Sequence, residues 1–468
     1  MLLVGIILYL LRPVASDARV LDGLNNAQYY MAKGFPEEAE VQLDWIQSME
    51  PWRNLPWSDL AAEYLQQGKP IRAITILEAI SRNKLLDSAA WMTLARGYEQ
   101  SGRPGQMEDS LLSLVRFNES GLETEKAYQM LVRLYRSQNR FEEAYQIQSV
   151  LVRLVPENKQ FVFDKVLLIM ALHQQEGLQE WKSTPDKPAW LIQAGNQIAA
   201  AILEENEAIR MVKIGRAFGG IENWDIAEYW LQKAVDISPN FAEAWAFLAE
   251  TRQQRGLEGK EQINRALDLA SESTGVRGLA AIYFRRQREF PKAVILLQKN
   301  IEDQPAESTW YLELGSVLAE TGKMEDATIA YQKAALLAPL DYSKQAALAR
   351  FCVQYEYRVR DLGLPAAVKA VELAPDNPEA QDVYGLTLLA LGEPEKASQA
   401  FSDALSLNPE YATTWLHMGQ SAIAAGDSAL AKDALLKTVK ISENSVEGRM
   451  ARRLLEQYFR IKYDALKN

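Results

Sequence analysis

The sequence predicts an all-α solenoid of about twelve helix-turn-helix repeats, closed at its C-terminal end by a capping helix. Three kinds of residue recur at a fixed spacing near the N-terminus, which indicates one small unit copied along the chain. They are spaced by 34 positions: Gly34, Gly68 and Gly102; Ala27, Ala61 and Ala95; Pro36, Pro70 and Pro104. A repeat array can reach 468 residues without a single large core, because each unit contacts only its neighbours.

The unit from Pro378 to Pro409 shows why each copy is expected to form two helices. Its first segment, EAQDVYGLTLLAL, has apolar residues at helical spacing. Gly392 then ends this helix, and Pro394 begins the second, where a missing N–H group costs nothing. Small and aromatic residues share the buried face of the second helix: Ala397, Phe401 and Ala404. One unit is therefore two antiparallel helices joined by a tight turn.

The other units follow the same pattern with different side chains. Small residues let two helices approach closely, and large ones fill the space between neighbouring units. The small positions include Ala27, Gly215, Gly385 and Ala397, and the large ones include Trp57, Tyr331 and Phe401. Two units, near Val166 and Ala349, are degenerate. Since no unit can bury its apolar face alone, stacking supplies the stability.

Aromatic, small, glycine, alanine and proline positions in this register resemble the tetratricopeptide repeat (TPR) family. The resemblance covers roughly residues 20 to 446 and leaves the subfamily open. It implies a right-handed superhelix whose concave face, lined by the first helix of each unit, binds peptides or proteins. The matching residues are structural, so they do not identify a partner.

The periodicity breaks between Pro156 and Glu207. Residues 176–188 (EGLQEWKSTPDKP) are expected to be an insertion between two helices, with Trp181 inside it and Trp190 just beyond. It is either a functional insertion or a tolerated surface loop. The sequence therefore divides into five parts: an N-terminal segment, 1–19; an N-terminal array, 20–157; a degenerate repeat with the insertion, 158–207; a C-terminal array, 208–446; and a capping helix, 447–468.

A second irregularity, Gln354 to Pro365, is expected to be a lengthened turn between helices. The final segment is amphipathic, with arginines such as Arg449 and Arg453 around Leu454 and Leu455. A solenoid needs such a helix to cover its last apolar face, although a basic helix could also meet a membrane surface or a partner.

The first 11 residues, MLLVGIILYLL, are apolar. The run is shorter than the roughly 20 residues of a membrane span and has no preceding basic residues typical of a secretory signal. Three interpretations remain: the end of a span that starts upstream, an atypical anchor or signal, and a first helix packed on the array. We expect membrane association through the N-terminus, on a side that the sequence does not determine.

The composition argues against several classes of chemistry. The net charge of −11 disfavours nucleic acid, which needs a basic surface. His173 and His417 lie far apart, and Cys352 is the single cysteine, so no ligand cluster is expected for a metal or cofactor. GSVLAETGKM, from Gly315 to Met324, lacks the spacing of a phosphate loop. We therefore expect no enzyme activity.

By the geometry of the family, the residue after the small packing position points toward the concave face. Basic residues occupy this position or a nearby one in several units: Arg96, Lys126, Arg133, Arg136, Lys213, Arg216, Arg285, Arg286 and Arg350. The hypothesis is a groove suited to acidic or carboxylate-bearing segments of a protein partner. The alternative is a set of solvated side chains whose stems cover apolar surface.

These observations favour a non-catalytic, membrane-associated scaffold or adaptor that holds protein partners in its groove. The alternative is an assembly factor for a membrane or cell-envelope complex, acting through the N-terminal anchor and the 176–190 insertion.

Overall fold

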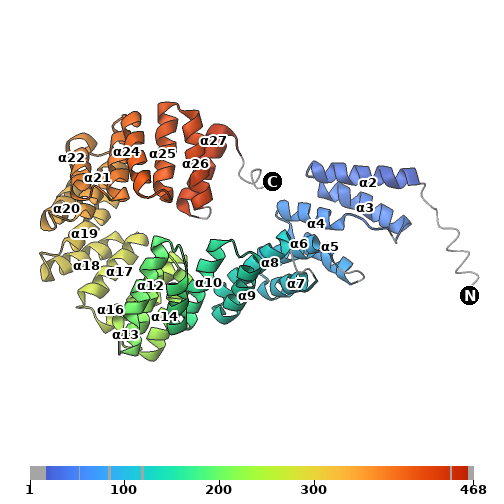
Figure 1. Ribbon diagram of the computed structural model, residues 1–468, viewed down its shortest axis with the longest axis horizontal. Helices are drawn as coiled ribbons and strands as arrows, with labels where there is room; N and C mark the ends of the chain where they lie inside the picture. The colour runs from blue at the N-terminus through green and yellow to red at the C-terminus, as the bar shows by residue number, and fades with distance from the viewer. Residues whose placement is uncertain (1–16, 52, 83–85, 118–120, 443–444, 462–468) are drawn as a thin grey trace, which may run out of the picture. The chain divides into compact units, whose positions relative to one another are not determined.

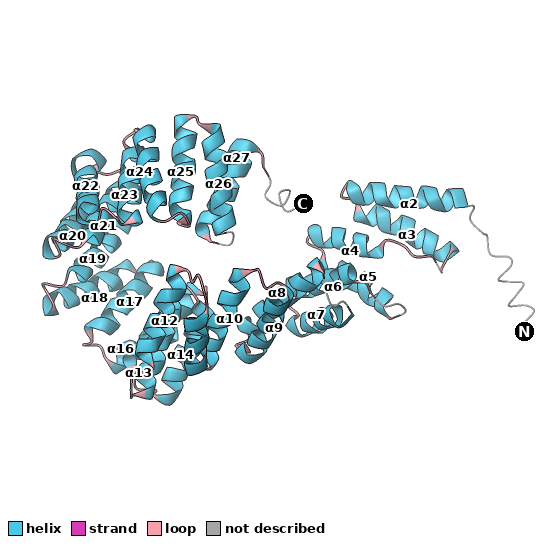
Figure 2. Ribbon diagram, in the orientation of Figure 1, coloured by secondary structure: helices cyan, strands magenta, loops and turns pink. Residues whose placement is uncertain are grey.

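The computed structural model describes residues 17–51, 53–82, 86–117, 121–442 and 445–461. Within them every regular element is a helix (Figure 2). The chain divides into two compact units, Met1–Ile237 and Ser238–Asn468. The five-part division by repeat type stays a prediction, and the expected break in periodicity between Pro156 and Glu207 lies inside the first unit.

The helices of the first unit follow one another along the chain (Figure 1). Their bounds are α2 Asp17–Ala32, α3 Pro36–Met49, α4 Trp57–Gln66, α5 Pro70–Ser81, α6 Ser88–Gln100, α7 Pro104–Phe117, α8 Leu122–Ser137, α9 Phe141–Leu154, α10 Lys159–Leu172, α11 Gln174–Ser183, α12 Ala189–Ala201, α13 Glu207–Gly219 and α14 Trp224–Ile237.

The second unit continues the series and includes one π-helical turn, η1. The bounds are α15 Ala242–Gln254, α16 Lys260–Leu269, α17 Thr274–Arg286, α18 Phe290–Asp303, α19 Ser308–Glu320, α20 Met324–Leu337, α21 Tyr342–Gln354, η1 Val359–Gly363, α22 Leu364–Leu373, α23 Pro378–Ala390, α24 Pro394–Leu407, α25 Ala412–Ala425, α26 Ser428–Ile441 and α27 Val446–Phe459.

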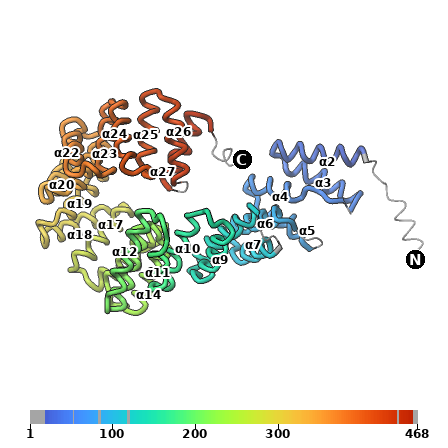
Figure 3. Tube along the Cα trace, in the orientation of Figure 1, coloured from blue at the N-terminus to red at the C-terminus, as the bar shows by residue number. Residues whose placement is uncertain are grey.

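Successive helices pack as pairs, and the backbone trace runs back and forth between them (Figure 3). The pair α23–α24 shows how the small position works. A Cβ atom added to Gly385 would lie 2.5 Å from Cε1 of Phe401, so only glycine allows this approach. The turn glycines have a different role. Gly68, for example, has φ +69°, and the backbone N–H of the next residue, Lys69, donates to the carbonyl of Tyr64 at 2.9 Å. This is the helix ending expected from sequence.

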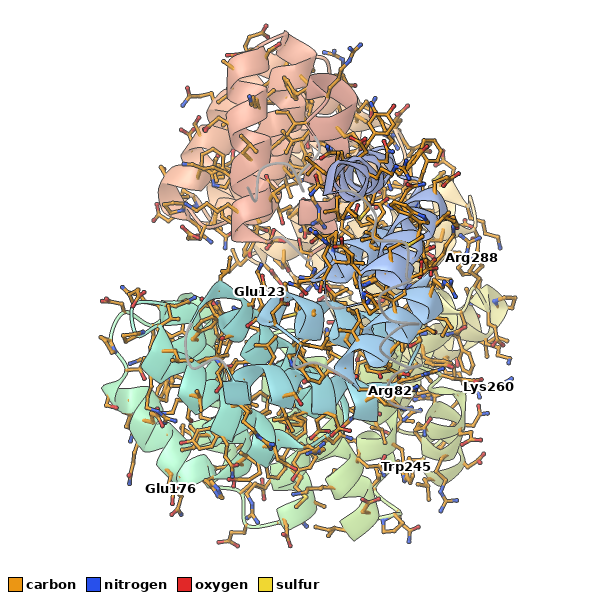
Figure 4. All side chains as sticks on the ribbon, turned by 90° about the vertical axis from the view of Figure 1, so that its right-hand side faces the viewer. Arg82, Glu123, Glu176, Trp245, Lys260 and Arg288 are labelled. Carbon is orange, nitrogen blue, oxygen red and sulfur yellow. The ribbon has the colours of Figure 1, made fainter. Side chains whose placement is uncertain are left out.

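The prediction that residues 176–188 are an insertion between two helices is wrong. Residues 174–183 form helix α11, which packs against α10 as the second helix of a pair. Gly177 allows this contact, because its Cβ would lie 2.5 Å from the Cα of Met170. Glu176 lies exposed on the outer side of this helix (Figure 4). The register is broken instead by α12, an additional helix that packs against α13 before the next pair begins.

The second irregularity is confirmed as a lengthened connection. Helix α21 ends at Gln354, and η1 precedes α22. Arg358, with φ +49°, begins this turn, and its guanidinium bonds Asp361 at 2.7 Å. Gly363 lies against Cys352. A Cβ atom added to Gly363 would lie 2.8 Å from the Cβ atom of Cys352.

The C-terminal helix α27 covers the last pair, as expected of a cap, and buries Ala451 and Leu455 against α25 and α26. At the other end, the apolar run of residues 1–11 lies outside the described residues. Among the helices that are described, none is both long enough and apolar enough to span a membrane.

Candidate functional site

All nine basic residues predicted for the groove lie on the first helix of a pair. They are Arg96 on α6; Lys126, Arg133 and Arg136 on α8; Lys213 and Arg216 on α13; Arg285 and Arg286 on α17; and Arg350 on α21. These residues differ in whether an acidic side chain of the same chain already pairs with them.

In the second unit the predicted basic residues face acidic ones. Arg285 lies 3.9 Å from Glu313 and 3.5 Å from Glu320. Arg286 lies 3.4 Å from Glu250, on the preceding first helix α15. These two arginines and three glutamates therefore carry a net charge of 2 − 3 = −1.

Arg350 is matched in the same way, by Glu379 on α23, which also accepts a hydrogen bond from Tyr342 at 3.0 Å. Burial raises the pKa of Glu313, and nearby Arg285 opposes this shift. The predicted groove residues of this unit therefore carry no excess positive charge, and they do not offer an unpaired basic side chain to an acidic segment.

Three of the predicted residues in the first unit are also engaged. Lys126 pairs with Glu123 at 3.1 Å and Lys213 with Glu204 at 2.6 Å. Arg216 also has an interaction within the chain. Since exposed pairs of this kind contribute about 0–1 kcal/mol, a partner could displace them at low cost.

Arg136 is held much more firmly. Its guanidinium makes a bidentate contact with Asp225, at 2.7 and 2.8 Å, and donates to the side chain of Asn223 at 2.8 Å. Asp225 lies in the first turn of α14, so the contact joins α8 to a helix far along the sequence. Nearby, the rings of Phe141 and Tyr229 meet edge to face with centroids 5.0 Å apart.

This tie between α8 and α14 (the α8–α14 tie) closes the C-terminal part of the first unit on itself, because α9 to α13 lie between the two helices in sequence. A regular solenoid has contacts between adjacent units alone. Burial on its own lowers the pKa of Arg136, but Asp225 outweighs this effect and raises it. Arg136 therefore has a structural role. Asp225 already occupies the guanidinium group that a partner's carboxylate would have to bind.

Arg96 and Arg133 are the remaining predicted residues, and both are exposed. Each follows the buried small position of its helix, Ala95 on α6 and Val132 on α8, and these two first helices pack against each other. In the part of the chain that the structure describes, neither has an ion-pair partner. They present two unmatched charges on adjacent repeats.

A pocket of about 310 Å³ adjoins Arg133. Its walls come from the α6–α7 turn, the start of α7 and the last two turns of α8. Met107, Met130 and Leu134 supply its apolar part, and each is less than a tenth exposed. Sequence reasoning missed this pocket, because both methionines are indistinguishable from ordinary core positions.

Trp181 and Trp190 are packing residues. Trp181 donates through Nε1 to the carbonyl of Leu191 at 3.0 Å and covers Gly195 of α12, where a Cβ would lie 2.1 Å from its ring. Trp190 meets the ring of Phe163 edge to face at 6.2 Å. Both therefore join α10, α11 and α12.

The groups considered for chemistry lie apart from one another. His417 is 2.9 Å from Asp382, which is almost fully buried, whereas His173 is exposed and 3.8 Å from Glu142. Burial raises the pKa of the Cys352 thiol to about 11, so the thiol is protonated at neutral pH. Among the described residues, no group of three or more histidine, cysteine or acidic side chains could hold a metal ion.

Two family models match the chain, both described as tetratricopeptide repeat. One matches residues 279–342 and the other residues 378–421, and each match contains the helix–turn–helix pair seen in the structure. The chain contains tetratricopeptide repeats in both of these stretches. The TPR assignment made from the sequence is thus confirmed, and this repeat is a scaffold for protein–protein interaction. No curated protein sequence matches the chain.

Several solved structures are similar to the chain at low sequence identity. Yeast Tom70 is 13% identical with a TM-score of 0.46, and the match covers 88% of this chain and 97% of the Tom70 chain. Cut9–Hcn1 of the APC/C is 14% identical with a TM-score of 0.39, covering 93% and 90%. YrrB, described as a TPR protein with an unusual peptide-binding site, is 21% identical with a TM-score of 0.29, covering 41% and 98%.

Proposed function

We propose that this TPR protein is a non-catalytic scaffold that holds an acidic segment of a protein partner against α6 and α8. The observation that carries the proposal is the pair Arg96 and Arg133. No described side chain forms an ion pair with either of these two exposed arginines, on a chain whose net charge is −11. Guanidinium groups bind carboxylates through two parallel hydrogen bonds, which gives both attraction and orientation.

Four of the other predicted basic residues do not support the same role. Arg285, Arg286 and Arg350 already face glutamates, and Arg136 is bound by Asp225. An acidic segment placed on the second unit would meet Glu250, Glu313 and Glu320, and like charges repel. The proposal is therefore limited to the face formed by α6 and α8.

Replacing both arginines with glutamate (Arg96→Glu with Arg133→Glu) is expected to abolish capture of the partner by the full-length chain. Each reversal removes a carboxylate contact and adds repulsion, so we expect affinity to fall by about a hundredfold or more. Affinity capture followed by mass spectrometry identifies the partner with the unchanged chain, and titration then measures the loss.

The matched control is Arg82→Glu with Arg116→Glu. It makes the same change in net charge at two exposed arginines that belong to the second-helix layer, at the end of α5 and on α7. The control is expected to keep the partner. Equal capture by both double variants would refute the proposed face.

We further propose that residues 1–11 attach the chain to a membrane, on the ground of their apolar composition. A chain lacking these residues is expected to move from the membrane pellet to the supernatant, whereas Arg96→Glu with Arg133→Glu leaves the pelleted fraction unchanged. Equal pelleting of the full and shortened chains would contradict the attachment.

The alternative of an assembly factor acting through residues 176–190 has no specific observation in its favour. It needs Trp181 and Trp190 to be available to a complex, whereas both are engaged in packing among α10, α11 and α12.

A further inference from the structure

We infer that the pocket beside Arg133 receives a large apolar side chain of the bound segment. The partner would then be recognised by an aliphatic or aromatic residue with a carboxylate next to it in sequence. This inference rests on the proposed function, since it specifies what the α6–α8 face binds.

The first step is the size of the pocket and its position. Its volume of about 310 Å³ is many times the roughly 10–15 Å³ that one water molecule needs, so it has room for one large side chain. The pocket lies between two adjacent helix pairs inside the first unit. Helices α6, α7 and α8, which form its walls, all contact one another. The arrangement of its walls is thus fixed by the packing of the repeats.

The second step is the chemistry of the floor. Met107 and Met130 are 5% exposed and Leu134 is 8% exposed, so their side chains form an apolar surface that is largely withdrawn from bulk water. Methionine side chains are unbranched and polarizable and adapt to different shapes. Such a floor favours an apolar side chain over a charged one without selecting a single residue type.

The third step is the charge of the rim. Arg103 and Arg133 carry positive charges, and neither has an ion-pair partner among the described residues, while Glu99 is the acidic side chain that lines the pocket. Arg96 lies one turn before Glu99 on α6. The surroundings are therefore net positive, and they complement a carboxylate held close to the inserted side chain.

Four capped hexapeptides test this recognition directly. They share the frame Gly-Ser-X-Z-Ser-Gly, with Leu or Ala at X and Asp or Asn at Z. The full-length chain carries ¹³C-labelled methionine methyl groups, of which it has 11, and each peptide is titrated while the methyl signals are followed. Met107 and Met130 report on the pocket itself.

We expect the Leu-Asp peptide to shift the Met107 and Met130 signals, and we expect Ala in place of Leu to weaken its binding about tenfold. Replacing Asp by Asn is expected to weaken binding by a similar factor. Absence of any shift at these two methyl groups with the Leu-Asp peptide would overturn the inference.

Ser137→Trp provides a variant that fills the pocket without changing its charge. Ser137 is exposed at the end of α8 and lines the pocket, so the indole should occupy the space meant for the partner. Gln66→Trp is the matched control, at the last residue of α4, where the side chain is also exposed. Signals of methionines outside the pocket report whether either variant remains folded.

We expect Ser137→Trp to weaken the Leu-Asp peptide about tenfold and Gln66→Trp to leave it unchanged. If both acidic peptides bind equally well to the unchanged chain and to Ser137→Trp, the pocket inference is wrong, while the role of Arg96 and Arg133 stands. If the double arginine reversal leaves partner capture intact, the proposed function itself fails.

Discussion

Replacing Arg136 with alanine is expected to lower the local stability of α8 and α14 by about 2–3 kcal/mol. The change removes three hydrogen bonds and leaves Asp225, whose side chain is 17% exposed, as an unpaired carboxylate in a desolvated place. Hydrogen exchange measured by mass spectrometry should show faster exchange in both helices, although they are far apart in sequence.

Lys159→Ala is the control for this prediction. Lys159 pairs with Asp186 at 2.8 Å, but the two side chains are 65% and 72% exposed, so its loss should cost no more than about 0.5 kcal/mol. The double variant Arg136→Ala with Asp225→Ala should regain part of the lost stability, because the orphaned charge is removed too. Unchanged exchange in α14 upon Arg136→Ala would show that the α8–α14 tie does not close the unit.

Replacing Gly177 with alanine is expected to destabilise the α10–α11 pair by about 3 kcal/mol. The added Cβ would lie 2.5 Å from the Cα and N atoms of Met170 and 2.8 Å from the carbonyl carbon of Ile169. These are backbone atoms of a neighbouring helix, so the two helices must separate to make room. The midpoint of thermal unfolding and the exchange rates of α10 and α11 both measure the effect.

Gly105→Ala is the control for the added methyl group. Gly105 lies near the start of α7, and its Cβ would have no atom within 4 Å, so the change should be neutral or should stabilise by up to about 1 kcal/mol. If Gly177→Ala behaves like Gly105→Ala, residues 174–183 are not packed as the second helix of a repeat.

The contrast between these glycines shows what the sequence could and could not predict. The 34-residue spacing of Gly34, Gly68 and Gly102 predicted the turns correctly, because a positive φ at a helix end is a local requirement. Gly177 lies in a segment with two prolines, which from sequence alone predicts an insertion. Its helix depends on contact with Met170, and such tertiary packing overrides local preference.

The sequence predicted the placement of the candidate groove residues but not their charge pairing. The repeat register placed all nine basic residues on first helices, since that placement follows from periodicity. The register could not reveal which charges are matched, because partners such as Asp225 for Arg136 lie outside the repeat that contains the arginine. Arg96 and Arg133 differ from the others in having no ion-pair partner among the described residues, and a periodic pattern does not contain that information.

Site-specific photo-crosslinking in cells tests the central claim, that a protein partner lies on the α6–α8 face, most directly. A photoreactive amino acid is placed at Glu99, on the exposed face of α6, and in a second chain at Gln106, which is exposed on α7. The account predicts a covalent adduct with one protein from Glu99, which disappears when Arg96 and Arg133 are reversed, and none from Gln106. An adduct from Gln106 without one from Glu99 would contradict it.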